Sequence, residues 1–132
     1  MTVPTVVVDA SAIGAILFAE PKGDAILERL RGCDLTAPAI IRCEVVSIAM
    51  KKNRARPGAR QEWLRRLRRY PALLVNEQEV VPAQVFALAL ETGLSAYHAS
   101  YLWLARRLGV ALITLDGDLA RAGEAAGSVG PG

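Results

Sequence analysis

The chain alternates short runs of apolar, often β-branched residues with longer stretches of helical periodicity. The short runs predict buried strands at Thr5–Val8, Asp34–Pro38, Ala72–Val75 and Val110–Leu115. The longer stretches predict helices over residues 10–20, 23–32, 39–52, 57–70, 82–93, 95–109 and 117–127. Strands separated by helices pair in parallel through right-handed crossovers, so the pattern predicts a three-layer α/β/α domain whose parallel sheet has four or five strands. In such sheets, binding sites gather at the carboxyl ends of the strands.

The length of 132 residues fits one domain with a core of its own, and we expect a single domain over residues 1–132. The Gly-rich segment from about residue 124 to residue 132 is expected to be a flexible tail in which no fifth strand is evident. No signal peptide or membrane-spanning run is recognisable, so we expect a cytoplasmic protein without a membrane partner. In a reducing compartment, Cys33 and Cys43 are expected to be free thiols.

The net charge is only +3, but the basic residues are unevenly distributed. Nine of the 16 Lys and Arg residues lie between Lys51 and Arg69, where Glu62 is the only acid. Such a cluster can be a solvated helical face, a surface that binds a polyanion, or a contact for an acidic protein. If the cluster binds nucleic acid by displacing counterions from phosphates, the candidate residues are Lys51, Lys52, Arg54, Arg65, Arg66 and Arg69.

Acidic residues follow two of the predicted strands. Asp9 comes directly after the first strand, Asp116 ends the run "LITLD", and Asp118 lies in the first turn of the next helix. Each has an ordinary structural explanation, because Asp caps helices and acids are favourable at helix N-termini. Parallel strands nevertheless bring the first two carboxylates to the same edge of the sheet, which makes them candidates for a shared site.

Glu44 lies in an apolar helical stretch, "AIIRCEVVSIAM". Ile40, Ile41 and Ile48 stand at i−4, i−3 and i+4 from Glu44 and share its helix face. A carboxylate on such a face loses hydration, at a cost of several kcal/mol unless it is paired or bound to a metal. A pair with Arg42 or another base would satisfy Glu44, but a cation shared with the other carboxylates explains its position better.

Mg²⁺ or Mn²⁺ suits this set of acids, because both ions favour hard oxygen ligands and keep several coordinated waters. The candidate catalytic ligands are Asp9, Glu44 and Asp116, with Asp118 as a further metal ligand. A metal-bound water of lowered pKa could attack a phosphodiester. The sequence offers no convincing Ser-His-Asp arrangement and no Gly-rich phosphate loop.

Four segments, in this order and at these spacings, resemble the successive motifs of PIN-domain proteins, in particular VapC-type toxins of toxin–antitoxin pairs. They are "VVVDASAIGAILFAE", "APAIIRCEVVSIA", "GLSAYHASYLWLARRLG" and "LITLDGDLARA", and the resemblance extends from Val6 to about Ala122. It implies a ribonuclease dependent on Mg²⁺ or Mn²⁺, with acids at Asp9, Glu44 and Asp116 and supporting hydroxyls at Ser11 and Thr114. It also implies an RNA substrate, a homodimer and inhibition by a cognate antitoxin.

The chain departs from the family pattern at His98. Where "LSAYDASY" would be expected, this chain has "LSAYHASY", so we expect the His98 side chain to point into the acidic cluster. Three interpretations stay open: a core or surface residue without a role, a ligand for Mn²⁺ or a later transition metal, or a protonated imidazole that weakens metal binding. The same helix offers core-facing candidates at Tyr97, Tyr101, Leu102, Leu104 and Ala105.

Two functions from different classes are therefore compatible with the sequence. The leading hypothesis is a toxin-like endoribonuclease in which His98 replaces the third acid of the metal site. The alternative is a degenerate, catalytically weak or inactive PIN domain that acts as an RNA- or protein-binding module. A flavodoxin-like regulatory domain would also place acids at strand ends, but it would leave Glu44 unexplained.

Overall fold

The computed structural model describes residues 3–125, and its centre is a four-stranded parallel sheet. The strands are β1 (Thr5–Val8), β2 (Asp34–Pro38), β3 (Asn76–Gln78) and β4 (Leu112–Ile113), arranged in the order β3-β2-β1-β4. Val7 pairs with Leu112 and Val8 pairs with Ile113, so the last strand lies directly beside the first. The predicted parallel sheet is confirmed, and it has four strands within the described residues.

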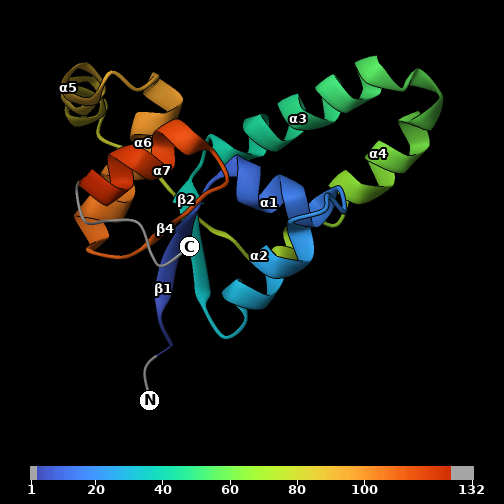
Figure 1. Cartoon of the computed structure of the whole chain (residues 1–132), viewed down its shortest axis with the longest axis horizontal. Helices are drawn as coiled ribbons and strands as arrows, with labels where there is room; N and C mark the ends of the chain where they lie inside the picture. Colours follow the sequence, from blue (N-terminus) through green and yellow to red (C-terminus); the bar gives the residue numbers. More distant parts are fainter. Residues whose placement is uncertain (1–2, 126–132) are drawn as a thin grey trace.

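Helices cover both faces of this sheet, which confirms the three-layer α/β/α arrangement (Figure 1). One side carries α1 (Ala10–Leu17) and α2 (Gly23–Leu30). The opposite side carries α5 (Pro82–Thr92), α6 (Ala96–Leu108) and α7 (Gly117–Ala125). The predicted helices are all present, with ends that differ from the predictions by a few residues.

The predicted strand at Ala72–Val75 is wrong, and the third strand lies further along the chain at Asn76–Gln78. Pro71 occupies the first turn of a short 3₁₀ helix, η2 (Tyr70–Leu73), which uses up most of the apolar run. Leu74 then adopts a left-handed conformation with φ of 54° and is 82% exposed. The polar strand β3 is held instead by its ladder to β2, an interaction that apolar periodicity does not reveal.

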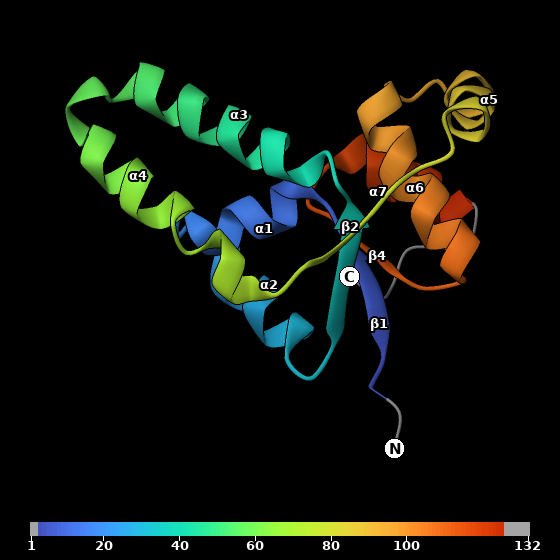
Figure 2. The same ribbon diagram turned by 180° about the vertical axis from the view of Figure 1, so that it is seen from behind.

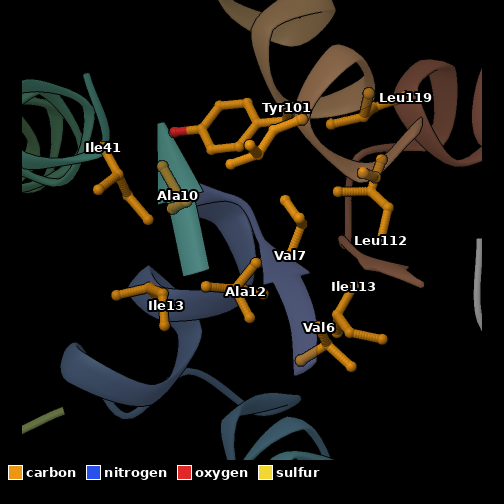
Figure 3. Close-up of a cluster of buried hydrophobic side chains, with 14 of the residues drawn as sticks. Val6, Val7, Ala10, Ala12, Ile13, Ile41, Tyr101, Leu112, Ile113 and Leu119 are labelled. Atoms are coloured by element: carbon orange, nitrogen blue, oxygen red, sulfur yellow. The ribbon is translucent and has the colours of Figure 1, made fainter. Parts of the chain in front are cut away.

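The core lies between the sheet and the two helical layers (Figure 3). Val7 and Val8 of β1 have no exposed surface, because helices pack on both faces of this central strand. Ile13 approaches from α1, and Tyr101 and Leu102 approach from α6. Tyr97 does not join them: it was expected in the core but is 56% exposed, since the first turn of α6 extends beyond the sheet.

A helical hairpin extends away from the sheet (Figure 2). It consists of α3 (Ile41–Ala55), the 3₁₀ turn η1 (Pro57–Ala59) and α4 (Arg60–Leu67). We call this segment, residues 41–67, the arm. Its outer part contacts the body of the protein where Lys52 Nζ lies 2.7 Å from Glu20 Oε1 and where Trp63 packs edge-on against Phe18.

Glu124, the first residue of the expected C-terminal tail, still belongs to α7. The rest of that tail, residues 126–132, lies outside the described residues. Cys33 and Cys43 are free thiols. Across residues 3–125, the helices are too short or too polar to cross a membrane. That the whole chain forms one domain remains a prediction.

Candidate functional site

Asp9 lies where β1 passes into α1. Its carboxylate Oδ1 accepts a hydrogen bond of 3.0 Å from the backbone N–H of Ala12, so Asp9 is the N-cap of α1. The hydroxyl of Ser11 donates to the same oxygen at 2.7 Å, and the hydroxyl of Thr114 donates to Oδ2 at 2.5 Å. Only 2% of Asp9 is exposed. Asp9 can therefore cap α1 and belong to a site at the same time.

The environment of Asp9 makes its negative charge costly. Burial raises the pKa of Asp9 above its ordinary value, and the bonds from Thr114, Ser11 and Ala12 oppose that rise without cancelling it. All three donors are neutral, and among residues 3–125 Asp9 forms no ion pair with a Lys or Arg side chain. A cation at this position would stabilise the carboxylate more than the neutral donors do.

Asp116 reaches the same place from β4. Its Oδ1 accepts from the backbone N–H of Leu119 at 2.9 Å, so it caps α7 much as Asp9 caps α1. Thr114 accepts from the Asp116 backbone N–H at 2.9 Å, and Ser11 accepts from the Leu115 N–H at the same distance. The two predicted supporting hydroxyls thus connect the ends of β1 and β4, and they fix the first and last acids relative to each other.

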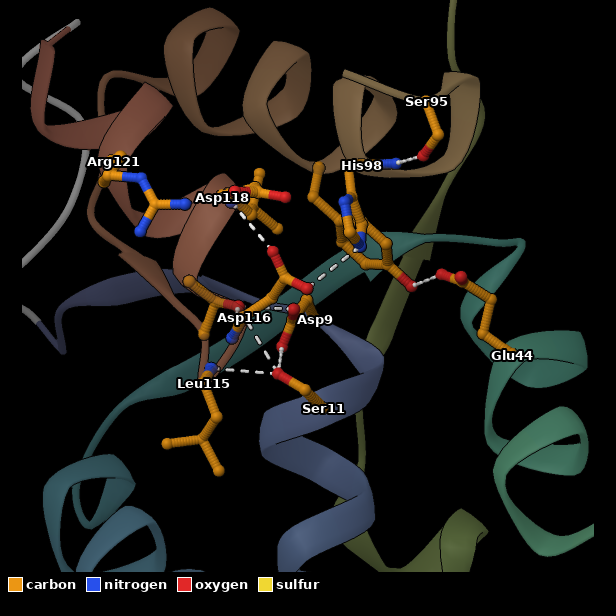
Figure 4. Close-up of polar contacts among 12 residues, drawn as sticks. Asp9, Ser11, Glu44, Ser95, His98, Leu115, Asp116, Asp118 and Arg121 are labelled. Atoms are coloured by element: carbon orange, nitrogen blue, oxygen red, sulfur yellow. Dashed lines mark hydrogen bonds and ion pairs between the residues drawn. The ribbon is translucent and has the colours of Figure 1, made fainter. Parts of the chain in front are cut away.

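Glu44 lies in the first turn of α3 and is half-buried. The sequence left open a pair with Arg42, but Arg42 Nε lies 2.7 Å from the carboxylate of Glu77 instead. Glu44 Oε1 accepts a hydrogen bond of 2.5 Å from the hydroxyl of Tyr101 (Figure 4). Burial first, and then this carboxylate, raise the pKa of Tyr101, so the phenol stays a neutral donor.

His98 points toward the acids, as the sequence predicted (Figure 4). Ser95 caps α6 by accepting from the backbone N–H of His98 at 3.1 Å, which fixes the start of the helix. The imidazole Nε2 lies 3.7 Å from Asp116 Oδ2, and both side chains are about one-third exposed. The family's acid position is thus occupied by a group that can either donate to a carboxylate or coordinate a metal.

These side chains line a single cleft of about 440 Å³ at the carboxyl edge of the sheet. It is lined by Asp9, Ser11, Glu44, His98, Tyr101 and Asp116, and further along by Glu20, Ser47, Lys51 and Lys52. Asp118 is not part of it. Asp118 pairs with Arg121, is largely exposed, and lines a neighbouring hollow that His98 also borders.

The donor set of this cleft fits a hard divalent cation. The oxygens free for coordination are Asp9 Oδ2, which accepts one bond, Glu44 Oε2, and Asp116 Oδ2, which faces His98. Among residues 3–125, however, no three His, Cys, Asp or Glu side chains stand close enough together to form a metal-binding group already. The three carboxylates would have to come closer together to share one cation.

The structure divides the predicted nucleic-acid-binding residues into groups. Lys51 and Lys52 line the cleft, and Lys52 is engaged by Glu20. Arg65 and Arg66 both pair with Glu62, and Arg54 borders an apolar groove between α3 and α4. Arg69 follows α4 and is exposed. Of these residues, only the two lysines line the cleft beside the acids.

Sequence reasoning placed Tyr101 in the core and missed its contact with the site. Tyr101 is 1% exposed, as a core residue should be, yet its hydroxyl reaches the cleft. A signal was present: Tyr101 lies three residues after His98, on the same face of α6. Glu20, which also borders the cleft, had no signal in the sequence.

Comparisons with known proteins give a family match and several similar proteins. Residues 6–125 match the sequence family described as the PIN domain. The chain is 32% identical over 116 residues to Ribonuclease VapC12 of Mycobacterium tuberculosis, which covers 88% of this chain and 90% of that protein. It is 34% identical over 124 residues to Ribonuclease VapC3 of Pyrobaculum aerophilum, covering 86% and 91%. The crystal structure of PAE2754 from Pyrobaculum aerophilum matches with a TM-score of 0.72 at 26% identity, over 90% of this chain and 79% of that one.

Proposed function

The chain belongs to the PIN-domain family, with VapC ribonucleases among its relatives, and from this premise we propose that it is the endoribonuclease toxin of a VapBC-like toxin–antitoxin pair. One observation carries the proposal: Asp9, Glu44 and Asp116 come from three separate elements and line one cleft. The relatives' names support RNA as the substrate and an antitoxin as the partner. A homodimer and a cytoplasmic location remain predictions.

We propose that Asp9, Glu44 and Asp116 hold Mg²⁺ or Mn²⁺, with His98 as a nitrogen donor at the edge of the site. When bound, such a cation lowers the pKa of a coordinated water and stabilises developing charge on phosphate. An imidazole donor favours Mn²⁺ over Mg²⁺. Asp118 is left out of the proposed set because it pairs with Arg121 outside the cleft.

The protein's own contribution is to fix the acids and to attract the substrate. Ser11 and Thr114 hold Asp9 in one orientation, which removes the need to reorganise it during the reaction. Lys51, in the same cleft, is the basic residue best placed to contact a phosphate next to the cleaved one. Arg65 and Arg66 are already paired with Glu62, so we expect them to contribute less.

The direct test is cleavage of several purified RNAs by the purified chain, with Mg²⁺, Mn²⁺, Co²⁺ or Zn²⁺ and with a chelator. We expect cleavage that is stronger with Mn²⁺ than with Mg²⁺ and absent with chelator. Asp9→Ala should abolish it, and Arg31→Gln, at an exposed residue that pairs with Glu28 outside the cleft, serves as a folded control that retains it. A wild-type protein that cleaves none of the RNAs with any of the four metals would contradict the proposal.

A second candidate function rests on the position of His98. With Nε2 only 3.7 Å from Asp116 Oδ2, a protonated imidazole would take the place of the cation electrostatically. The chain would then be a degenerate PIN domain that binds RNA or protein without cutting. Strong metal-dependent cleavage by the unmodified protein would exclude this candidate.

A further inference from the structure

Tyr101 connects the buried core to the acidic cleft. Its ring packs among core residues of the sheet and α1, and its hydroxyl reaches the cleft beside Glu44 (Figures 3 and 4). The hydroxyl donates to Glu44 Oε1 at 2.5 Å, which is short for a bond from a neutral hydroxyl and typical of one that meets a charged acceptor. The packed ring leaves the phenol oxygen little freedom to move.

Glu44 depends on this one contact more than the other acids depend on any of theirs. Asp9 is held by two hydroxyls and a backbone N–H, and Asp116 is held as a helix cap. Within residues 3–125, the Glu44 carboxylate has Tyr101 as its one hydrogen-bond partner. Glu also has one more side-chain torsion than Asp, so without a partner it would sample more orientations.

We propose that Tyr101 is the positioning residue of the metal site: it holds Glu44 through Oε1 and leaves Oε2 free for the cation. The inference rests on the proposed metal site and deepens it. Because His98 replaces one acid, the site has three carboxylates. The orientation of each one therefore contributes more to the affinity for metal than it would in a site with four. Hydrogen-bond partners of metal ligands typically change metal affinity by about 10–100-fold when they are removed.

The test measures Mn²⁺ binding by titration calorimetry of the full chain, without RNA. Tyr101→Phe keeps the ring and removes the hydroxyl, and we expect a loss of Mn²⁺ affinity of roughly tenfold or more. Tyr70→Phe is the matched control, since Tyr70 donates at 2.8 Å to Glu77, outside the cleft. A general effect of losing a tyrosine–glutamate bond would appear in both variants, whereas positioning would appear only in Tyr101→Phe.

A double-mutant cycle then asks whether Tyr101 acts through Glu44. In a Glu44→Gln background, Tyr101→Phe should cause no further loss of Mn²⁺ affinity. An equal loss in both backgrounds, or an unchanged affinity in Tyr101→Phe alone, would overturn the inference. Circular dichroism confirms that each variant is folded, and in the unmodified protein Mn²⁺ should perturb the tyrosine ultraviolet spectrum.

The outcome is separable from the proposed function. If the wild-type protein binds Mn²⁺ but cleaves no RNA, the ribonuclease proposal is contradicted. The Mn²⁺ affinities of Tyr101→Phe and Tyr70→Phe then still test the role of Tyr101. Cleaving protein whose Mn²⁺ affinity is the same in Tyr101→Phe would support the ribonuclease and overturn the positioning role. Wild-type protein that binds no Mn²⁺ would overturn the inference together with the metal site.

Discussion

Asp9 and Glu44 face the same cleft but are held in opposite ways. Asp9 stands at a strand end, almost fully buried, with donors from Ser11, Ala12 and Thr114. Glu44 stands on a helix at the base of the arm, half-buried, with Tyr101 as its partner. Within the described part of the chain, the strand side of the cleft is therefore fixed by several donors, and the helix side by the single donor Tyr101. Losing one donor would disturb the orientation of Glu44 more than that of Asp9.

The largest effect should come from Asp9→Asn, which keeps the shape of the fixed side and removes its charge. We expect cleavage to fall by more than about 100-fold, because even changes in the outer partners of a metal ligand cost roughly 10–100-fold. Stability without metal should fall far less, because burial already raises the pKa of Asp9 and its charge is unfavourable in the fold, although the amide N–H cannot accept the hydroxyl bond that the carboxylate accepts. Cleavage rates and urea unfolding with chelator measure the two effects, and a parallel loss of both would contradict the comparison.

His98→Asp tests whether residue 98, beside Asp116, limits metal binding. An added carboxylate near Asp116 should raise Mg²⁺ affinity by about tenfold or more, equivalent to roughly 1.4 kcal/mol. The preference for Mn²⁺ over Mg²⁺ should shrink at the same time. Calorimetry with both metals gives the answer, with His98→Asn as the uncharged control. Equal gains in the two variants would mean that the charge of residue 98 is unimportant.

Thr114→Val removes one support from the fixed side while nearly keeping the volume of the side chain. Thr114 donates to Asp9 and accepts from the Asp116 N–H, so the change leaves two polar groups short of a partner. We expect the free energy of unfolding to fall by about 1–3 kcal/mol. Urea unfolding measures this, and Thr92→Val, which changes a hydroxyl away from the cleft, is the control. Equal losses in both would show that Thr114 has no special role.

The smallest effect concerns Glu77, which lies outside the cleft. Among residues 3–125, and unlike Asp9, Glu77 pairs with a cationic side chain. Burial alone would raise the pKa of Glu77, but Arg42 and Tyr70 outweigh burial and lower it below 4.5. A lowered pKa contributes stability that is present above the unfolded value of about 4.5 and is lost as the pH falls through the folded value. Glu77→Gln should therefore flatten the decline of stability in this acidic range. Parallel unfolding curves for the two proteins would contradict the assignment.

The sequence predicted the part of the fold that depends on local pattern. Valine-rich β1 and the periodic helices were found because burial dictates their composition. Polar β3 was missed because its pairing to β2 is a tertiary interaction, and Leu74 was misassigned because nothing local shows that it lies at the surface. The last strand was predicted over six residues, but β4 comprises only Leu112 and Ile113. The chain leaves the sheet after Ile113, where polar contacts such as the bond from the Leu115 N–H to Ser11 begin.

The candidate site followed the same division. Asp9, Glu44 and Asp116 could be picked from their positions, and the structure places all three on one cleft. The partner of Glu44 could not be predicted, because the sequence offered Arg42 as a nearby base. Only packing reveals that Arg42 binds Glu77 and that Tyr101 binds Glu44. The pair between Lys52 and Glu20 was equally hidden, since it depends on how α3 packs against the body of the protein. The pairs of Arg65 and Arg66 with Glu62 lie at i+3 and i+4 on one helix and could be read from the sequence.

The pairing of the first strand with the last also determines when the cleft can form during synthesis of the chain. Asp9 leaves the ribosome early, but its partner Thr114 follows 105 residues later. Until β4 has docked, Asp9 lacks one of its hydroxyl donors and Asp116 is absent, so an unfinished chain cannot assemble the cleft. The order of the strands thus delays assembly of the cleft until the C-terminal part of the chain has been synthesised.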